Sequence, residues 1–135
     1  MSLDQALQKA VTAIPECVAA GFIDLASGML LSVKTVDSHP SEVMDLLAAA
    51  TADLFQGSNV TTIEQIFKKA RGVPAGDQHH YFQEIIVNSD NLLHIFLRGK
   101  TNEALVATFV CRRSTNLGMA LTKARAAMPE LESMV

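Results

Sequence analysis

Residues 21–32 read Gly21-Phe22-Ile23-Asp24-Leu25-Ala26-Ser27-Gly28-Met29-Leu30-Leu31-Ser32. Apolar residues lie on both sides of the short break Ala26-Ser27-Gly28, and the first apolar run extends back to Cys17. Such a run is typical of a strand that is covered on both faces of its sheet. Gly28 suits the positive φ angle that a tight turn requires. The stretch therefore predicts a β-hairpin with strands over residues 17–25 and 29–33.

A short amphipathic helix is predicted before this hairpin. Ser2-Leu3-Asp4-Gln5 has the residue types of a capping box, in which the two polar side chains bind backbone N–H groups of the first turn. Apolar residues then recur at helical spacing until Pro15, which ends the pattern. These residues are Leu3, Leu7, Val11 and Ile14.

The longest helix is expected after the hairpin. Asp37-Ser38-His39-Pro40 ends the second strand, and proline suits the first turn of a helix. Gly57-Ser58-Asn59 interrupts the helical pattern, after which Thr62 and Gln65 predict the cap of a second amphipathic segment. The apolar positions are Val43, Leu46, Leu47, Ala50 and Leu54 in the long helix, and Ile63, Ile66, Phe67 and Ala70 in the segment.

Three further strands and a final helix complete the chain. The strands are expected over residues 80–87, 92–98 and 103–111, because the short separators between them are rich in turn-forming residues. A last helix is expected to begin at Ser114 and to end at Pro129. The element order is therefore α-β-β-α-β-β-β-α. It predicts an α/β (α+β) fold in a single domain over residues 1–135, a five-stranded antiparallel sheet flanked by helices.

The composition argues against binding to nucleic acid or insertion into a membrane. Hydrophobic residues make up 49% of the 135 residues, which is enough to build a core, and the formal net charge is −3. The basic residues are scattered, apart from two short clusters at 68–71 and 112–113, whereas nucleic-acid platforms concentrate positive charge. The longest apolar stretch is far short of the ~20 residues that a membrane helix needs. The start of the chain has no basic stretch followed by an apolar one.

The element order, together with the hairpin, resembles the roadblock/dynein light chain family. In that family the opening hairpin has a glycine, apolar residues, an acidic residue and a second glycine at the turn, which Gly21, Asp24 and Gly28 match. The resemblance covers nearly the whole chain. It implies a profilin-like sandwich and homo- or heterodimers that extend the sheet or pair the long central helix. It also implies a role as a platform or regulator for Ras-like small GTPases or for motor and signalling complexes.

The resemblance also indicates where a partner would bind. A free edge strand beside an amphipathic helix is a ready dimer surface, so the long helix and the strand over residues 80–87 are the contact candidates. The segment 59–79 is longer than the connection expected for the family, and two interpretations stay open: it covers the edge strand, or it is an addition specific to a partner. The interface candidates are Leu47, Thr51, Leu54, His80, Phe82 and Glu84.

The polar residues do not form a recognisable catalytic, cofactor or metal site. His79 and His80 are adjacent, and adjacent strand residues point to opposite faces, so the pair is poorly placed to chelate one ion. Cys17 and Cys111 lie in apolar strands, where burial raises the pKa of a thiol and keeps it inert. Two cysteines without a CxxC motif indicate reduced thiols and a cytoplasmic protein. The sequence has no GxxxxGK[ST] or GxGxxG phosphate loop.

The leading hypothesis is a non-enzymatic homodimeric adaptor or regulator that engages a small GTPase or a larger assembly, without a cofactor. The alternative is a small-ligand sensor, because profilin-like sandwiches can hold ligands between sheet and helix; a closed interior around Phe22 and Phe109 would count against it. A third hypothesis is an enzyme whose site combines polar residues such as Asp77, His79, His80 and Glu84.

Overall fold

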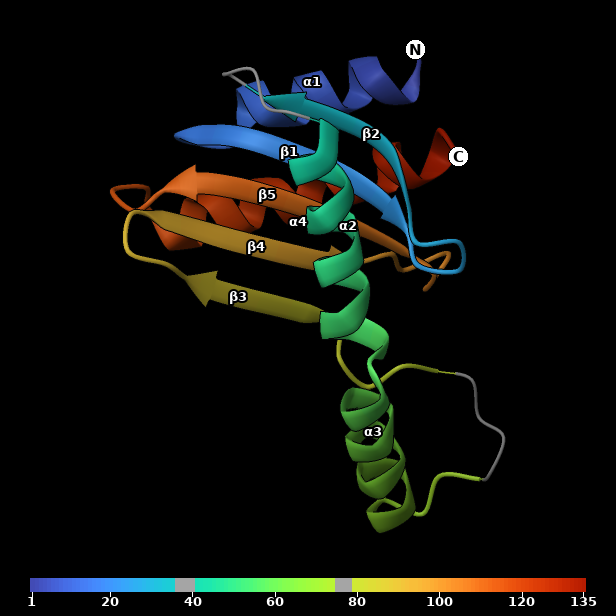
Figure 1. Ribbon diagram of the computed structural model, residues 1–135. Coiled ribbons are helices and arrows are strands. Elements are labelled where there is room, and N and C mark those ends of the chain that lie inside the picture. The colour runs from blue at the N-terminus through green and yellow to red at the C-terminus, as the bar shows by residue number, and fades with distance from the viewer. Residues whose placement is uncertain (36–40, 75–78) are drawn as a thin grey trace.

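The computed structural model describes residues 1–35, 41–74 and 79–135, except that the side chains of residues 41–47 are outside the description. The predicted start of the long helix at Pro40 lies outside the described residues. Figure 1 shows the arrangement of the elements. They are α1 (Leu3–Ala13), β1 (Cys17–Asp24), β2 (Met29–Thr35), α2 (Ser41–Gln56), α3 (Ser58–Ala70), β3 (Glu84–Asn88), β4 (Leu92–Arg98), β5 (Leu105–Arg112) and α4 (Leu117–Ser133).

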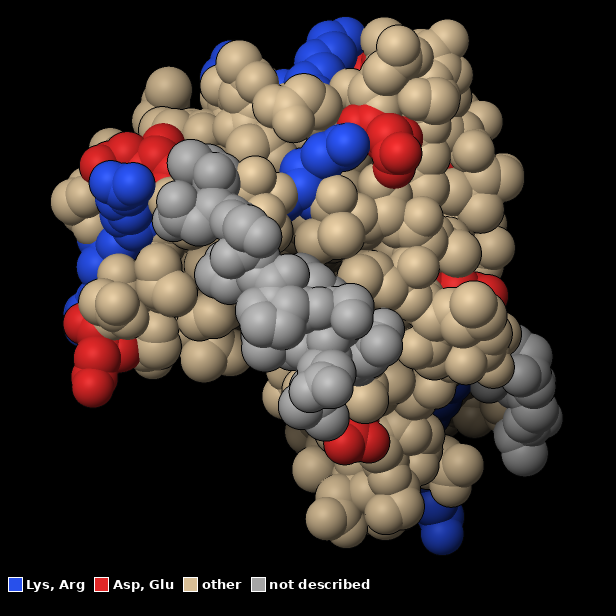
Figure 2. Space-filling view, turned by 45° about the horizontal axis from the view of Figure 1, so that its top comes forward, with Lys and Arg blue, Asp and Glu red and all other residues tan. Residues whose placement is uncertain are grey.

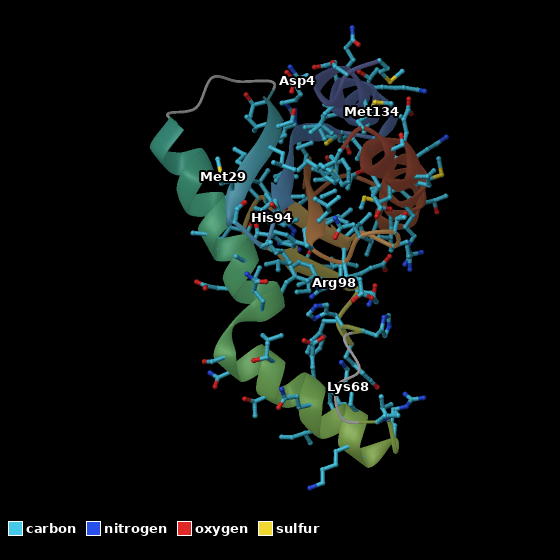
Figure 3. All side chains as sticks on the ribbon, turned by 90° about the vertical axis from the view of Figure 1, so that its right-hand side faces the viewer. Asp4, Met29, Lys68, His94, Arg98 and Met134 are labelled. Atoms are coloured by element: carbon cyan, nitrogen blue, oxygen red, sulfur yellow. The ribbon has the colours of Figure 1, made fainter. Side chains whose placement is uncertain are left out.

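The strands form one five-stranded antiparallel sheet in the order β2-β1-β5-β4-β3. In its centre, Phe22 of β1 lies opposite Ser32 of β2 and Ala107 of β5. Helices α1 and α4 cover one face of the sheet and α2 covers the other (Figures 1 and 3). The predicted fold class is confirmed, with the predicted second amphipathic segment present as α3. Within the described ranges, none of the helices has both the length and the apolarity that crossing a membrane requires.

Each face of the sheet has its own apolar cluster. The larger cluster lies under α1 and α4 and includes Leu7, Phe22, Phe109 and Leu131, all with 0% exposure. The smaller cluster lies under α2. Because successive residues of a strand point to opposite faces, Phe22 belongs to the first cluster and its neighbour Ile23 to the second. This explains the continuous apolar run in β1. The smaller cluster consists of Ile23, Leu25, Ala48, Phe55, Phe96 and Val106.

The opening hairpin and the first helix form as predicted. Gly28 has a φ of 72°, and its N–H donates to the carbonyl of Asp24 at 2.8 Å. The capping box is complete, because Ser2 Oγ accepts from the N–H of Gln5 and Gln5 Oε1 accepts from the N–H of Ser2. The hydroxyl of Ser32 donates to the carboxylate of Asp4 and so joins β2 to α1.

The predicted cap of the second segment is wrong. Helix α3 begins directly after Gly57, and Thr62 lies inside it, where its hydroxyl donates to the carbonyl of Ser58 at 2.8 Å. Gly57 marks the break between α2 and α3, because a Cβ atom at this position would lie 2.6 Å from the carbonyl oxygen of Asp53. The chain therefore bends at the glycine and resumes helical geometry at once.

The predicted ends of the last helix are also wrong. Asn116 caps α4 by accepting from the N–H of Met119 at 3.0 Å, whereas Ser114 donates its hydroxyl to Glu16. Pro129 does not end the helix, which continues to Ser133. A proline costs a helix one hydrogen bond, but Leu131 in the following turn is fully buried in the larger cluster. The free energy gained by burying this turn outweighs the tendency of proline to end a helix.

Candidate interaction surface

The two edges of the sheet, β2 and β3, are covered to different extents. Helices α1 and α2 both pack against β2. Among the described strands, β3 pairs with β4 alone, and Ile86 and Val87 expose 39% and 38% of their surfaces. The outer side of an edge strand presents N–H and C=O groups with which another strand can pair. Of the two edges, β3 is therefore the better placed to receive one.

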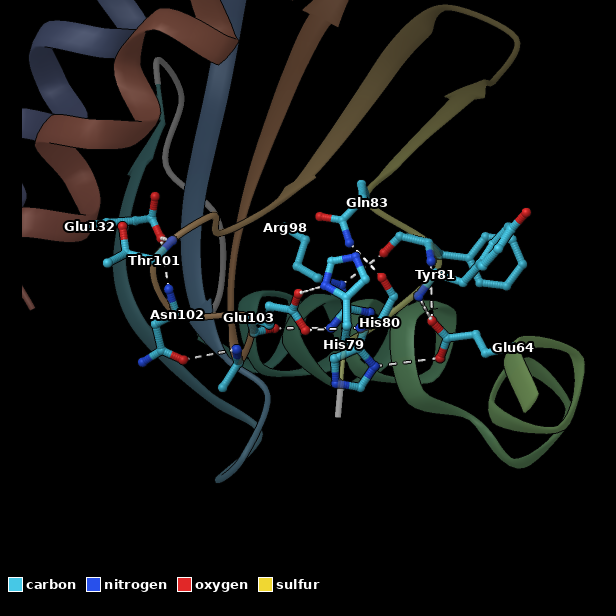
Figure 4. A network of polar contacts seen from close by, with 12 residues as sticks. Glu64, His79, His80, Tyr81, Gln83, Arg98, Thr101, Asn102, Glu103 and Glu132 are labelled. Carbon is cyan, nitrogen blue, oxygen red and sulfur yellow. Dashed lines mark hydrogen bonds and ion pairs between the residues drawn. The ribbon is translucent and has the colours of Figure 1, made fainter. Parts of the chain in front are cut away.

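Strand β3 begins at Glu84, and the prediction that it begins at His80 is wrong. The carboxylate of Glu64 in α3 accepts from the N–H groups of Tyr81 and Phe82, and it lies 3.5 Å from Nδ1 of His80. These N–H groups are directed to a helix side chain and so cannot join a strand ladder. Glu64 is 4% exposed, so it holds this segment from a buried position (Figure 4).

A second carboxylate holds the same segment from the turn between β4 and β5. Glu103 accepts from the backbone N–H of His80 at 2.9 Å and lies 2.5 Å from Nδ1 of His79. Glu103 therefore binds the start of the segment 79–82, and Glu64 binds its end (Figure 4).

Arg98 of β4 ties this network to α2. Arg98 is 2% exposed, and its guanidinium donates to the carbonyls of Phe82 at 2.8 Å, Glu103 at 2.9 Å and Phe55 at 3.1 Å. It also lies 5.0 Å from the centre of the Phe55 ring. Burial lowers the pKa of Arg98, while the nearby carboxylates of Glu64 and Glu103 act in the opposite direction. One side chain thus joins the end of α2, the segment before β3 and the β4–β5 turn.

Helix α3 extends past the β3 edge as an arm (Figures 1 and 3). Besides Glu64, two further side chains contact Tyr81 in the described segment before β3, namely Phe67 of α3 and Arg71, which follows it. The rings of Phe67 and Tyr81 have centres 4.9 Å apart, and Nη1 of Arg71 donates to the hydroxyl of Tyr81 at 3.2 Å. Within the described part of the segment 59–79, α3 extends past the end of the sheet and does not pair with β3, so this helix does not itself cover the edge (Figure 1).

The predicted interface residues lie in different environments. On α2, Leu54 is 37% exposed, whereas Thr51 is fully buried within the chain, and the side chain of Leu47 lies outside the described residues. His80 and Phe82 belong to the anchored segment before β3, and their backbone N–H groups are bound by Glu103 and Glu64. Glu84 starts β3 and forms a two-armed ion pair with Arg125 of α4, which lowers the pKa of Glu84. His80, Phe82 and Glu84 thus lie before or at the start of β3, whereas Thr51 and Leu54 lie on α2, and the interface itself stays a prediction.

Two buried residues that matter here were not identified from the sequence. Glu64 stands within an amphipathic pattern and reads as an ordinary helix carboxylate, while Arg98 reads as the polar end of a strand. Only their partners in space show their roles. The sequence contained one weak indication that Glu64 is buried. Ile63 and Phe67, in the same two turns, place Glu64 beside the apolar side of the helix.

An open cavity of about 310 Å³ lies between α4 and the adjoining ends of β3 and β4. The Glu84–Arg125 ion pair lies on its wall with Leu97 and Met128. Phe22 and Phe109 do not line this cavity and are fully buried in the larger cluster, to which Leu97 and Met128 of the cavity wall also belong. The space between sheet and helices that a ligand sensor would use is therefore filled by side chains at these two positions.

The cysteines and His94 are parts of the sheet. Cys17 and Cys111 face each other across β1 and β5, both buried. A hydrogen bond from the neighbouring thiol and burial raise the pKa of Cys111, whereas the same hydrogen bond lowers the pKa of Cys17 in spite of its burial. Burial acts in the predicted, pKa-raising direction on both thiols, and at Cys17 the shared hydrogen bond outweighs it. Burial lowers the pKa of His94. Among the described residues, no group of histidine, cysteine and acidic side chains could hold a metal ion.

Charged side chains on the surface are of mixed sign. Figure 2 shows basic and acidic residues interspersed over one face of the molecule, with wide areas of uncharged residues between them. On this face, no single sign of charge prevails.

Comparisons with known proteins identify the fold. No family model and no curated protein matches the sequence. Among solved structures, the roadblock/LC7 domain from Streptomyces avermitilis is similar, with a TM-score of 0.70 and 15% identity, over 98% of this chain and 97% of that one. The gliding protein MglB from Thermus thermophilus is similar with a TM-score of 0.72 and 18% identity, over 98% and 87% of the two chains.

The profilin from Schizosaccharomyces pombe is also similar, with a TM-score of 0.57 and 12% identity over 98% of each chain. At such low identities the similarity establishes the architecture. The resemblance to roadblock proteins is thus confirmed for the fold, and the profilin-like sandwich is confirmed with it.

Proposed function

We propose that this chain is a non-enzymatic, homodimeric adaptor or regulator of the cytoplasm, formed by one roadblock-like domain over residues 1–135. Its partner is a Ras-like small GTPase or a motor or signalling assembly. The observation that carries the proposal is the β3 edge, where Ile86 and Val87 are exposed and the strand pairs on one side only within the described chain.

Two-fold pairing is the natural use of such an edge. When β3 of one copy pairs antiparallel with β3 of another, the outward N–H and C=O groups of each strand bind the C=O and N–H groups of the other. The two sheets then become one. A similar protein supports an assembling role, because one of the matching structures is described as MglB with a tetrameric arrangement. The engagement of a GTPase rests on the likeness to roadblock proteins.

A ligand sensor is the alternative function, and the open cavity beside α4 is the observation that favours it. At about 310 Å³ the cavity has the size of a small ligand site. The Glu84–Arg125 pair on its wall would supply polar contacts.

Sedimentation equilibrium of the purified protein tests the dimer. We expect the Ile86→Lys variant to weaken the dimer by about tenfold or more, because a charged side chain on an edge strand opposes pairing. Leu31→Lys is a matched control, since Leu31 is 38% exposed on the opposite edge strand, β2. A wild-type protein that stays monomeric at high concentration would refute the homodimer.

Binding to Ras-like GTPases of the source organism tests the partner. Each purified GTPase is immobilised with GDP or with a non-hydrolysable GTP analogue, and binding of the protein is followed by interferometry. A preference for one nucleotide state is expected of a regulator. Absence of binding to both states would contradict the GTPase part of the proposal and leave the motor or signalling assembly.

A further inference from the structure

The arm has an apolar side that the described part of the chain leaves uncovered. Ile63, Ile66 and Phe67 of α3 expose 42%, 59% and 41% of their surfaces. Their spacing of three and four residues places them on one side of the helix, which we call the arm stripe. Single exposed apolar residues are common on protein surfaces, but a contiguous set on one helix indicates a contact surface.

The arm is fixed in position although its stripe is exposed. Glu64, on the next side of the helix, accepts the N–H groups of Tyr81 and Phe82 from a buried position. Phe67 adds a ring contact to Tyr81 from the end of the stripe. The polar anchor therefore holds the helix beyond the end of the sheet (Figure 3), with the arm stripe exposed.

The short β3 strand argues that a dimer needs a second surface. Strand β3 has five residues, Glu84–Asn88. Stable interfaces bury about 1,200 Å² or more in total, and the pairing of two such short strands buries only part of that area. Because the arm projects at the same edge, a copy that pairs with β3 comes into reach of it (Figure 1).

The charge of the arm favours a second copy as its occupant. Residues 58–71 contain Lys68, Lys69 and Arg71 against one acidic residue, Glu64, and so contribute +2 to a total of −3. The rest of the chain therefore carries −5, and α2 contributes only acidic residues to that charge. A basic arm tip is attracted to the acidic body of another copy, and the attraction is screened by salt.

We infer that the α3 arm packs its stripe onto a second copy of this chain, so that two arms, exchanged across the two-fold axis, brace the paired β3 strands. This inference rests on the proposed homodimer. Ile63 and Ile66 supply the buried apolar contact, and the basic residues at the end of the arm lie toward the acidic body of the other copy.

Sedimentation equilibrium of Ile66→Asp and Gln65→Asp variants tests the inference. Both substitutions add one negative charge to α3, but Gln65 lies on the polar side of the helix, away from the stripe. We expect Ile66→Asp to weaken the dimer by about tenfold or more relative to Gln65→Asp, because it removes a buried isoleucine contact. Raising the salt concentration from 50 to 500 mM (about a threefold shorter screening length) should also weaken the wild-type dimer, because salt screens the attraction between the basic arm tip and the acidic body.

The possible outcomes separate the two proposals. A dimeric wild type in which Ile66→Asp and Gln65→Asp have equal dissociation constants overturns the arm inference and leaves the homodimer standing. It would mean that another protein, or none, covers the stripe. A monomeric wild type refutes the homodimer itself. If Ile66→Asp does not fold by circular dichroism, the milder Ile66→Ser variant takes its place, with Gln65→Ser as control.

Discussion

Phe109 in the sheet and Ile66 on the arm are both large apolar residues, but the first has no exposed surface and the second exposes 59% of it. The sheet is held by apolar side chains packed on both faces, with the larger cluster under α1 and α4. The arm is held by hydrogen bonds to one carboxylate, Glu64, and by the contacts of Phe67 and Arg71 with Tyr81.

Apolar burial and hydrogen bonds to a buried carboxylate control different properties of the molecule. Apolar burial is strong but not directional, so it supplies most of the free energy of folding. A buried carboxylate with several N–H donors contributes less net stability but fixes direction, because its donors must point at it. The sheet therefore accounts for the stability of the fold, and the Glu64 anchor accounts for where the arm stands.

The largest effect is expected in the sheet. Phe109→Ala should lower the free energy of unfolding by about 3–5 kcal/mol, because it leaves a cavity in the larger cluster. Phe67→Ala on the arm is the matched control, and we expect it to cost about 1 kcal/mol, the value of a single ring contact. Urea denaturation of both variants measures the two effects. If both variants lost the same free energy of unfolding, the conclusion that the sheet supplies most of the stability would be wrong.

A smaller and local effect is expected at the anchor. Glu64→Ala removes the acceptor of the Tyr81 and Phe82 N–H groups, and we expect their protection from hydrogen exchange to fall by about 10- to 100-fold, equivalent to about 1–3 kcal/mol. Amides in the centre of β1 and β5 should keep their wild-type protection. Glu64→Gln keeps one acceptor oxygen and should lie between the two. If the Ala variant exchanged like the wild type, the anchor would not be holding the segment.

The smallest effect is expected at His94, a polar residue within the sheet. Burial lowers its pKa in the folded protein below the ordinary value of 6.5. The folded state therefore binds fewer protons than the unfolded state, so stability is intact above pH 6.5 and is lost as the pH falls toward the folded pKa. Melting temperatures between pH 7.5 and 5.5 (about one unit either side of that value) should fall less in His94→Gln than in the wild type. Parallel pH profiles would rule out this source of pH dependence.

Sequence-based prediction succeeded where the local pattern and the tertiary structure favour the same conformation. The hairpin around Gly28 and the capping box of Ser2 and Gln5 were both predicted, because each depends on residues within a few positions of one another. Prediction failed at the start of β3 and at Pro129. At the first site a carboxylate far away in sequence takes the strand's hydrogen bonds, and at the second the burial of Leu131 overrides the proline.

The candidate surface stays a prediction, although the structure shows the environment of its residues. The sequence placed it at the long helix and the third strand, and Glu84 lies at the start of β3 with His80 just before it, whereas the exposed residues Ile86 and Val87 lie further along the strand. The sequence could not show that Thr51 is buried, because a small polar residue fits both the apolar and the polar side of an amphipathic helix. It also missed the anchor, because Glu64 and Tyr81 are 17 residues apart.

The sequence by itself determined the order of the elements, the antiparallel hairpin and the two-sided burial of the central strands, because these follow from the periodicity of apolar residues and from turn-forming residues along the chain. The tertiary structure decided which sheet edge stays open, where the arm stands and which charged groups are buried. Those features depend on contacts between residues far apart in the chain, such as Arg98 with Phe55, and a linear pattern carries no record of such pairs.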